Sequence, residues 1–448
     1  MTATSLPPVD QAFFDVDYET MPRAQLEDVQ LELLLDTIAL AYERAPLVRE
    51  TWQAAKVRPA DIRTLDDFRE KVPFISKDAV RRFRDEKGDP YGGLLCLDTA
   101  ELTAVMSTSG TTGDPTLVAE RWGGEPVGRR AVMYRDFWGM GVRPGDYVAL
   151  VLFTFRGPTY SFVQSLGAIP ILLDYELGEL ERLLRLSIRY RPTALYNFGG
   201  TMINAVADVA AACGIDPRDA FSSYRAIVWA GEPLGARARQ LAESWGLPLF
   251  EHSSVGDVTA CFECHAHDGM HVWEDTALVE GIDPDSVDHT GAAAVAEDGA
   301  RCELVATALV NRVAPLIRYR SDDIVRLDRR PCGCGRTHAR VHTIGRKGDE
   351  LVVQGRSILP VDLWAAVESL PACRLGLFQM VRPAREADEL RLRVGFQDVP
   401  ADGLPALADH VAAAVAAAVG IEPVVELVPN EVLLRLGPPH KIPRVTAR

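Results

Sequence analysis

Apolar residues recur at helical spacing in the first part of the chain. Between residues 24 and 45, the apolar positions on one helical face are Leu26, Val29, Leu33, Leu34, Ile38, Ala41 and Tyr42. Pro46 interrupts the pattern because proline disrupts a helix interior, and a second helical stretch covers 48–55. We therefore predict a helical N-terminal region, with another helix starting near Asp66 and a short strand at 103–106.

From residue 146 to residue 250, short apolar runs alternate with amphipathic stretches. Residues 147–155 are nearly all β-branched, aromatic or leucine, which is typical of a buried strand. The other predicted strands are 170–173, 194–197, 226–229 and 247–250, and the predicted helices are 161–166, 177–190, 202–213 and 236–245. This alternation predicts parallel sheets covered by helices.

The pattern changes after residue 300. Segments 303–307 and 315–320 are predicted to be antiparallel strands. Beyond Arg346, a smaller α+β region is predicted, with strands at 350–353, 376–382, 390–395 and 424–427 and helices at 360–369 and 404–419. A chain of 448 residues is also too long for one ordinary core. We predict an α/β fold with a large N-terminal domain of helix-covered mixed or parallel sheets, residues 1–344, and a small α+β C-terminal domain, residues 345–448.

Composition and charge narrow the class of protein. Apolar residues make up 47% of the chain and charged residues 25%, which is the globular range. The formal net charge is −15, which disfavours nucleic acid and anionic membranes as partners. The sequence holds no run of about 18 apolar residues, and residues 1–10 lack a signal-peptide pattern. We expect a cytoplasmic protein with no membrane span.

A loop rich in hydroxyl groups and glycine follows the predicted strand 103–106. Its residues are Ser107, Thr108, Ser109, Gly110, Thr111, Thr112 and Gly113. Glycines let backbone N–H groups approach an anion closely, and hydroxyls donate further hydrogen bonds, so the loop suits a polyphosphate. It is not a Walker loop, because no Gly-Lys-Ser/Thr follows. A flexible connection without a ligand is the alternative on composition alone.

The motif Ser-Thr-Ser-Gly-Thr-Thr-Gly-x-Pro-Thr resembles the phosphate-binding motif of the acyl-adenylate-forming superfamily. The segments Met-Pro-Arg-Ala-Gln-Leu-Glu from residue 21, Leu-Asp-Asp-Phe from residue 65 and Val-Pro-Phe-Ile-Ser-Lys-Asp from residue 72 are similar to its phenylacetate-CoA ligase branch. The resemblance runs from about residue 20 to the C-terminus. It implies binding of ATP and a two-domain fold with a mobile C-terminal domain.

Three further motifs are carried over from this resemblance. Ala230, Gly231, Glu232 and Pro233 match the segment that packs on adenine, and an ordinary strand-to-helix turn is the alternative. Asp323, in Tyr-Arg-Ser-Asp-Asp, would accept hydrogen bonds from both ribose hydroxyls. Arg346, in Ile-Gly-Arg-Lys-Gly-Asp, would lie near ribose or phosphate. A surface acid and a solvated arginine are the respective alternatives.

Several positions depart from the family pattern. In the segment 250–257 we place Asp257 on the acid that holds Mg²⁺, so Ser253 stands where an aromatic is usual, Ser254 replaces glycine and Gly256 replaces threonine. The other register would put Ser254 on the acid, and a plain loop after a strand is the alternative. Asp114 stands where relatives usually carry lysine. Gly348 replaces the first acid of the hinge motif, and glycine tolerates large backbone changes.

Lys441 is the predicted catalytic residue. It lies in Gly-Pro-Pro-His-Lys-Ile-Pro-Arg, where the family has Gly-Lys-x-x-Arg. Attack of a carboxylate on the α-phosphate brings two anions together, and a mobile ammonium touching both would offset that repulsion. A solvated terminal lysine is the alternative.

Two clusters of cysteine and histidine suggest a metal. One is Cys332-Gly-Cys334, and the other contains Cys261, Cys264, His265, His267 and His271. Two thiolates of a Cys-x-Cys turn with one more cysteine and a histidine make the four ligands that zinc prefers. By resemblance to some members of the branch, the set is Cys264, His271, Cys332 and Cys334, with His265 or His267 as substitutes for His271. Free thiols and surface histidines are the alternative.

The resemblance implies a two-step reaction. A carboxylate displaces pyrophosphate from ATP·Mg²⁺, and the C-terminal domain then rotates so that a thiol captures the acyl group. Coenzyme A is the expected thiol and a small aromatic acid the expected substrate. Residues that could line an aryl pocket are Phe155, Tyr160, Tyr196, Phe198 and Gly199, which could equally be core.

Two other functions stay open at the level of sequence. The acyl acceptor could be a carrier protein, an amine or another small nucleophile, as the altered segment 252–257 suggests. The chain could also be a non-catalytic homologue that binds only nucleotide or acyl ligand, as Asp114 and Gly256 suggest. A homodimer is a candidate assembly.

Overall fold

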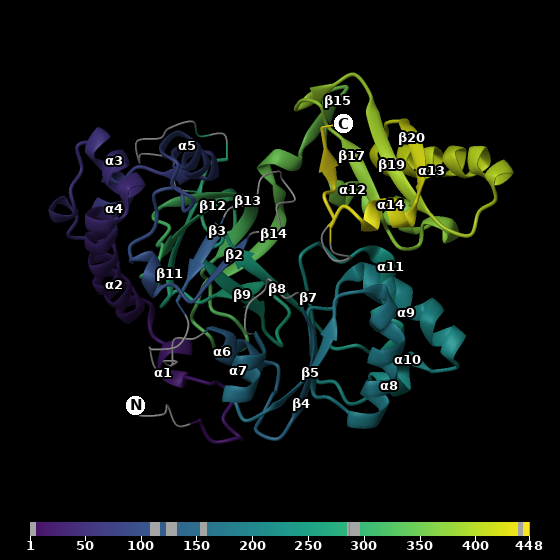
Figure 1. The fold of residues 1–448 in the computed structure, drawn as a ribbon, viewed down its shortest axis with the longest axis horizontal. Helices are drawn as coiled ribbons and strands as arrows, with labels where there is room; N and C mark the ends of the chain where they lie inside the picture. Colours follow the sequence, from purple (N-terminus) through teal and green to yellow (C-terminus); the bar gives the residue numbers. More distant parts are fainter. Residues whose placement is uncertain are drawn as a thin grey trace. The chain divides into compact units, whose positions relative to one another are not determined.

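The computed structural model of the chain describes residues 6–107, 117–121, 132–152, 159–284, 286, 296–437 and 442–447. These residues form two compact units (Figure 1). Unit 1 contains the described residues of 1–139 and 252–347, and unit 2 contains those of 140–251 and 348–448. Each unit therefore joins segments that are far apart in the sequence.

The N-terminal part of unit 1 is helical, as predicted. Its helices are α1 (Val16–Glu19), α2 (Arg23–Arg44), α3 (Pro46–Ala54), α4 (Leu65–Lys71), α5 (Lys77–Lys87) and α6 (Val132–Gly139), with short 3₁₀ turns η1 (Pro59–Asp61) and η2 (Thr99–Glu101). Leu26, Leu34, Ile38 and Ala41 of α2 are fully buried, which confirms the predicted apolar face. Pro46 is the first residue of α3, where its missing N–H costs nothing.

The strands of unit 1 form a mainly antiparallel sheet. Their order is β11 (Ala277–Ile282), β12 (Arg301–Ala308), β13 (Tyr319–Asp328), β14 (Arg340–Arg346), β10 (Met270–Val272), β9 (Thr259–Glu263) and the end of β8 (Leu249–Val255). Strand β1 (Ile75–Ser76) pairs with β13 in parallel, and β2 (Ala104–Ser107) forms a separate hairpin with β3 (Leu117–Glu120). The predicted antiparallel pair is confirmed, but its second strand begins at Tyr319 and not at residue 315.

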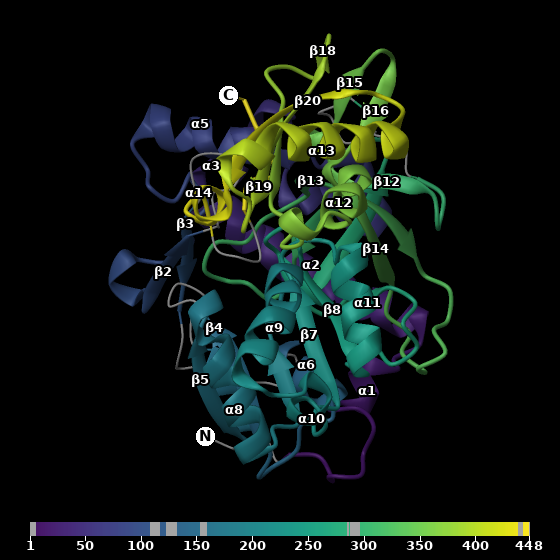
Figure 2. The same cartoon turned by 90° about the vertical axis from the view of Figure 1, so that its right-hand side faces the viewer.

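Residues 140–251 of unit 2 alternate between strand and helix. The parallel strands are β5 (Ile169–Asp174), β4 (Tyr147–Leu152), β6 (Ala194–Tyr196) and β7 (Ala226–Ala230). The helices are α7 (Thr159–Ser165), α8 (Leu180–Tyr190, after η4, Leu177–Glu179), α9 (Gly200–Cys213), α10 (Pro217–Ala220) and α11 (Ala236–Trp245). Figures 1 and 2 show α8 to α11 together on one face of these strands. The predicted helix-covered parallel sheet is confirmed.

The described residues of 348–448 contribute two small sheets and three helices to unit 2. The strands are β15 (Leu351–Val353), β16 (Arg356–Ile358), β17 (Phe378–Val381), β18 (Glu386–Ala387), β19 (Leu390–Phe396), β20 (Pro423–Pro429) and β21 (Val445–Thr446). The helices are α12 (Pro360–Glu368), α13 (Leu404–Val419) and α14 (Asn430–Leu434), with 3₁₀ turns η5 (Lys347–Asp349), η6 (Pro371–Cys373) and η7 (Ala401–Gly403). The α+β character predicted for this segment is confirmed.

Among the described residues, one helical stretch, Ala401–Val419, is long and apolar enough to cross a membrane by length and composition. Core helices of globular proteins pass the same test. Leu407, Val411 and Val415 of this helix pack in the hydrophobic core of residues 351–445. The apolar side of the helix is therefore used for packing inside unit 2.

Candidate active site

A tight turn at the tip of β8 and β9 carries the acid that we predicted for Mg²⁺. Gly256 and Asp257 are its central residues, with φ of +53° and +59°, and the N–H of Val258 donates to the carbonyl of Val255 at 2.9 Å. Positive φ at both central positions is typical of the turns that join antiparallel strands. The turn holds Asp257 exposed at the end of the hairpin.

Gly256, which stands on the family threonine in our preferred register, occupies a left-handed position of this turn. A Cβ at this position would lie 2.7 Å from the Cβ of Ser321 on β13. The left-handed backbone alone also disfavours any side chain there. The close approach between the turn and β13 therefore leaves no room for a side chain at residue 256.

Asp323 and Arg346 face each other across β13 and β14. They are paired in the strand register, and Nε of Arg346 donates to Oδ1 of Asp323 at 3.0 Å. The backbone N–H of Asp323 donates to Oγ of Ser321 at 3.1 Å. Burial raises the pKa of Asp323, and the charge and hydrogen bond of Arg346 oppose that shift. The structure therefore brings together two residues that were predicted from separate motifs.

Lys77 is a charged residue of this region that the sequence analysis missed. It is the first residue of α5 and follows β1, which runs beside the start of β13. Burial lowers its pKa, while the negative charges of Asp257 and Asp322 raise it. The segment Val-Pro-Phe-Ile-Ser-Lys-Asp could have signalled it, since that segment carried part of the family resemblance. Lys77, Asp257, Asp323 and Arg346 form what we call the unit 1 charge cluster.

The other residues predicted for nucleotide lie on strand ends. Ser253 is half-buried and Ser254 is exposed; they pair with Cys261 and Ala260 on β9. In unit 2, Ala230 ends β7, while Gly231, with φ of +96°, Glu232 and Pro233 form the turn that follows. The carboxylate of Glu232 receives two hydrogen bonds from Arg444, at 2.7 and 2.6 Å. This pairing of two predicted motifs was not foreseen.

Part of the predicted site lies outside the described residues. This applies to Phe155 and Lys441, to Asp114, and to the phosphate loop residues Thr108, Ser109, Gly110, Thr111, Thr112 and Gly113. Ser107 ends β2, but its side chain is outside the described set. Their predicted roles stay predictions.

The four described residues expected at an aryl pocket have different environments. Phe198 is fully buried and packs against Phe221 in the core of unit 2, with 5.9 Å between ring centroids. Gly199 is also buried, and its N–H donates to the hydroxyl of Tyr175 at 3.0 Å. Tyr196 is half-buried, whereas Tyr160 is exposed. Phe198 is therefore a core residue, which is the alternative that the sequence left open for the predicted pocket residues.

Four predicted metal ligands converge in unit 1. Sγ of Cys264, Cys332 and Cys334 and a ring nitrogen of His271 all lie within 4.8 Å of one another. The Sγ atoms of Cys264 and Cys332 are 3.6 Å apart, and Sγ of Cys334 is 3.3 Å from Nε2 of His271. The alternatives His265 and His267 are exposed. His271 therefore completes the cluster.

Strand geometry and hydrogen bonds orient these ligands. His271 lies in the middle of β10, and its Nδ1 is 3.1 Å from the carbonyl oxygen of His338, which leaves Nε2 toward the cysteines. The N–H of Arg336 donates to Sγ of Cys334 at 3.4 Å. A hydrogen bond from Cys264 lowers the pKa of Cys334, and His271 lowers it further. These are features of a site that holds a thiolate.

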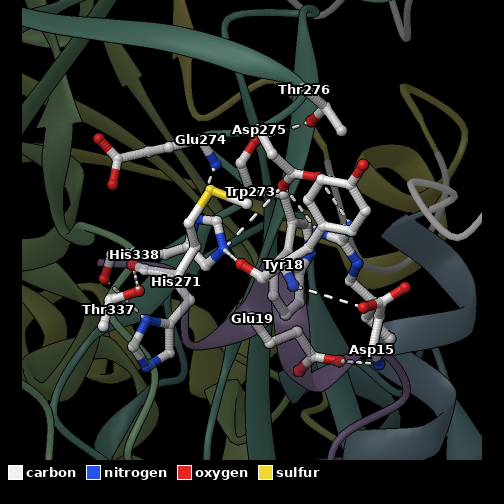
Figure 3. A network of polar contacts seen from close by, with 12 residues as sticks. Asp15, Tyr18, Glu19, His271, Trp273, Glu274, Asp275, Thr276, Thr337 and His338 are labelled. Atoms are coloured by element: carbon white, nitrogen blue, oxygen red, sulfur yellow. Dashed lines mark hydrogen bonds and ion pairs between the residues drawn. The ribbon is translucent and has the colours of Figure 1, made fainter. Parts of the chain in front are cut away.

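A buried polar network connects His271 to residues of the N-terminal segment (Figure 3). Nε2 of His338 is 2.8 Å from the carbonyl oxygen of Tyr18, and Nδ1 of His338 accepts the N–H of Glu274 at 3.0 Å. Arg336 donates to Glu19 at 2.8 Å. Because the network joins α1 to β10 and to the loop before β14, ligand geometry and the packing of α1 depend on each other.

Solved structures define the class to which this fold belongs. The chain is similar to a 2-hydroxyisobutyryl-CoA ligase solved in the postadenylation state in complex with 2-HIB-AMP, with 26% identity and a TM-score of 0.80. That match covers 100% of this chain and 95% of the other. The same ligase has been solved with 2-HIB-AMP and CoA in the thioesterification state. The fold is that of AMP-forming acyl-CoA ligases.

Curated relatives narrow the comparison further. A phenylacetate-coenzyme A ligase of Thermus thermophilus is 29% identical over 393 residues, covering 85% of this chain and 84% of the relative. A phenylacetate-coenzyme A ligase of Escherichia coli is 28% identical over 380 residues, covering 81% and 78%. No family model matches the chain. The predicted relationship to the phenylacetate-CoA ligase branch of the acyl-adenylate-forming superfamily is confirmed.

Proposed function

We propose that this chain is an AMP-forming acid–thiol ligase. In the first step, an oxygen of the substrate carboxylate attacks the α-phosphorus of ATP, and pyrophosphate leaves. In the second step, the thiol sulfur of coenzyme A attacks the acyl carbonyl, and AMP leaves. The observation that carries this proposal is the similarity over the whole chain to a ligase solved with both an acyl-AMP and CoA.

The unit 1 charge cluster supports a role in the first step. We assign Asp323 to the ribose hydroxyls, since a carboxylate accepts two hydrogen bonds at once, and Arg346 to ribose or phosphate. Lys77 is assigned to a phosphate oxygen, because its ammonium lies near Asp257, the residue assigned to the Mg²⁺ that would accompany the phosphates. Asp257 is assigned to Mg²⁺, which prefers carboxylates together with phosphates.

Residues outside this cluster are assigned from the family resemblance. The phosphate loop 107–113 is proposed to bind the triphosphate, and Ala230, Gly231, Glu232 and Pro233 to contact adenine. Lys441 is proposed to supply positive charge to the reacting oxygens. The boundary between the catalytic and mobile domains is proposed at residues 344–345, with Gly348 as part of the hinge.

We further propose that Cys264, His271, Cys332 and Cys334 hold a structural Zn²⁺. Three thiolates and an imidazole fit zinc in number and type, and the second ring nitrogen of His271 already has a carbonyl partner. All four donors come from the protein, so the ion would stabilise unit 1 and would take no part in the reaction. A cytoplasmic location, where thiols stay reduced, fits this use of cysteine.

The acid is proposed to be small and aromatic, because the curated relatives are phenylacetate-CoA ligases. The test is pyrophosphate release with ATP·Mg²⁺ over arylacetic, aryl and 2-hydroxy acids, followed by thioester formation with CoA. We expect release that depends on the acid and a Lys441→Ala variant that binds ATP but releases little pyrophosphate. A purified, folded chain that releases no pyrophosphate with any acid would contradict the proposal.

A further inference from the structure

The turn that supplies two of the proposed zinc ligands continues directly into residues that hold the N-terminal segment 11–23. We call residues 332–338 the ligand turn. Cys332 and Cys334 lie at its start, where the N–H of Gly335 donates to the carbonyl of Cys332 at 3.0 Å. The rest of the ligand turn makes its hydrogen bonds to segment 11–23. The metal ligands and the contacts of this segment are therefore parts of one short stretch of chain.

Arg336 contacts both a zinc ligand and the N-terminal segment. Its backbone N–H donates to Sγ of Cys334 at 3.4 Å, and its Nη1 lies 3.9 Å from the same sulfur. Its Nε donates to Oε2 of Glu19 at 2.8 Å, and its guanidinium lies 5.0 Å from the ring centroid of Phe13. The side chains of Arg336 and Glu19 are only 6% and 0% exposed, so this ion pair is shielded from water.

The two residues that follow Arg336 also hold the N-terminal segment. Oγ1 of Thr337 donates to the carbonyl of Met21 at 2.6 Å. Nε2 of His338 lies 2.8 Å from the carbonyl oxygen of Tyr18 (Figure 3). The carbonyl oxygen of His338 in turn lies 3.1 Å from Nδ1 of His271, the ligand on β10. Two of the four proposed ligands, Cys334 and His271, thus share their neighbours with segment 11–23.

Charge gives a second reason for this arrangement. Zn²⁺ with three thiolates and a neutral imidazole carries one net negative charge, and a buried net charge is costly unless an opposite charge lies close to it. Arg336 places a positive charge beside Cys334. The carboxylate that pairs with Arg336 also holds the start of α1, because Oε1 of Glu19 accepts the N–H of Asp15, the N-cap of that helix, at 3.0 Å. The guanidinium therefore lies between the metal site and the acid of α1.

We propose, building on the zinc site assigned above, that Arg336 is a positioning residue for Cys334 and that bound zinc holds segment 11–23 on unit 1. Zinc fixes the ligand turn, and the ligand turn presents three consecutive side chains to the segment. When zinc leaves, the cysteines take up protons and the ligand turn loses this constraint, so the contacts to the segment weaken. Such coupling is reciprocal, and docking of the segment strengthens zinc binding by the same factor. No part in the ligase reaction is assigned to the segment.

The first test is hydrogen exchange of the full chain, with zinc bound and after its removal by a chelator. The amides of Glu19 and Thr20, which donate within α1, should exchange about 10- to 100-fold faster without zinc. Helix α3, which packs in a separate core of unit 1, is the internal control, and its exchange should change much less. An equal increase in both helices would mean general destabilisation of unit 1 and would overturn the proposal.

The second test measures zinc affinity by competition with a chromophoric chelator. Glu19→Gln and Arg336→Lys should each bind zinc about 10- to 100-fold more weakly than the wild-type chain, as expected for loss of a group that orients a ligand. Glu280→Gln is the matched control, since it removes a carboxylate from another buried arginine pair of unit 1, with Arg318, at exposures of 4% and 1%. Its zinc affinity should equal that of wild type.

The results separate this proposal from the zinc site on which it rests. A wild-type chain that binds no zinc would overturn both. A chain that binds zinc but shows the same exchange at α1 with and without the metal would overturn the coupling and leave the zinc site standing. Equal losses of zinc affinity in Glu19→Gln and Glu280→Gln would also overturn the role of Arg336. The exchange comparison uses the wild-type chain, so it holds even where a variant does not fold.

Discussion

Replacing Gly256 with alanine should destabilise unit 1 through two separate effects. The first is the left-handed backbone, with φ of +53°, which costs a residue with a Cβ about 1–2 kcal/mol. The second is the approach of 2.7 Å between the new Cβ and the Cβ of Ser321, which must be relieved by a shift of strand β13 or of the turn. Forcing an extra methyl group into a packed site costs about 1–3 kcal/mol.

Alanine also lowers the conformational entropy of the unfolded chain, which offsets about 0.4–1 kcal/mol of the loss in stability. The net expected loss is therefore about 2–4 kcal/mol for Gly256→Ala. For a unit of this size, that corresponds to a fall in Tm of roughly 5–15 °C. The assay is thermal unfolding followed by circular dichroism, together with chemical denaturation to check that the transition stays cooperative.

Gly299→Ala is the matched control for this prediction. Gly299 has φ of +80°, but a Cβ there would meet no atom within 4 Å. Gly299→Ala introduces the unfavourable left-handed backbone but no steric contact. The free energy of unfolding should therefore fall by about 1 kcal/mol. In a double-mutant cycle, the coupling energy between Gly256→Ala and Ser321→Gly should be about 1–3 kcal/mol, because removing the Ser321 side chain relieves the contact with the new methyl group. Equal losses at Gly256 and Gly299, or no coupling with Ser321, would refute the steric explanation of this turn.

Three further outcomes are expected. Arg135→Leu should destabilise the protein by about 3–5 kcal/mol, because Asp275 would be left unpaired with a fully buried side chain; denaturation showing a loss below about 1 kcal/mol would contradict this. Purified protein should contain about one zinc per chain by elemental analysis, and Cys334→Ser should lose it with a lower Tm, whereas retention of zinc would exclude this ligand set. Lys77→Ala should raise the KM for ATP by about tenfold, as expected for loss of a charged hydrogen bond. Arg82→Ala, on the exposed side of α5, should leave the KM unchanged. Equal effects of the two variants would mean that only the overall charge of the helix matters, which would contradict the role of Lys77.

The βα alternation of residues 146–250 could be predicted because each strand is an almost unbroken apolar run. Helix α11 was predicted with the bounds Ala236–Trp245 that it has in the structure, and α13 with the bounds Leu404–Val419. In both cases a glycine in the left-handed conformation follows the helix and ends it. Local signals were sufficient there.

The elements that were missed lack such signals. Helix α5 has only Val80 and Phe83 as buried residues among eleven, so its apolar face is too narrow to recognise. Strand β10 is three residues long and is buried partly through His271, which reads as polar in the sequence. These segments are stabilised by partners that are distant in the sequence, and a single sequence does not reveal those partners.

The residues of the candidate site also divide into those that a local motif predicted and those that depend on contacts with distant segments. Asp323 and Arg346 were predicted because their motifs resemble those of the acyl-adenylate-forming superfamily. The Cys-x-Cys spacing suggested a metal, and the same resemblance selected Cys264, His271, Cys332 and Cys334. The role of Lys77 and the pairing of Arg444 with Glu232 were missed, although all three residues lie in segments that carried the resemblance, since a motif does not show which distant residues its side chains contact. Only the pairing of β1 with β13, and the return of the chain terminus to β17, give these residues their neighbours.

The balance of charge in the unit 1 cluster shows why it should act only together with a cation. The carboxylates of the cluster and its neighbours are matched in number by cations: Asp257, Asp322, Asp323 and Glu303 lie near Lys77, Arg81, Arg346 and Lys347. The cluster alone therefore offers little net positive charge to a triphosphate. A divalent cation shared between phosphate oxygens and Asp257 would add that attraction. Tight ATP binding to this chain should therefore require Mg²⁺, and Asp257→Asn should weaken that requirement; equally tight binding in the presence of a chelator would contradict the role assigned to Asp257.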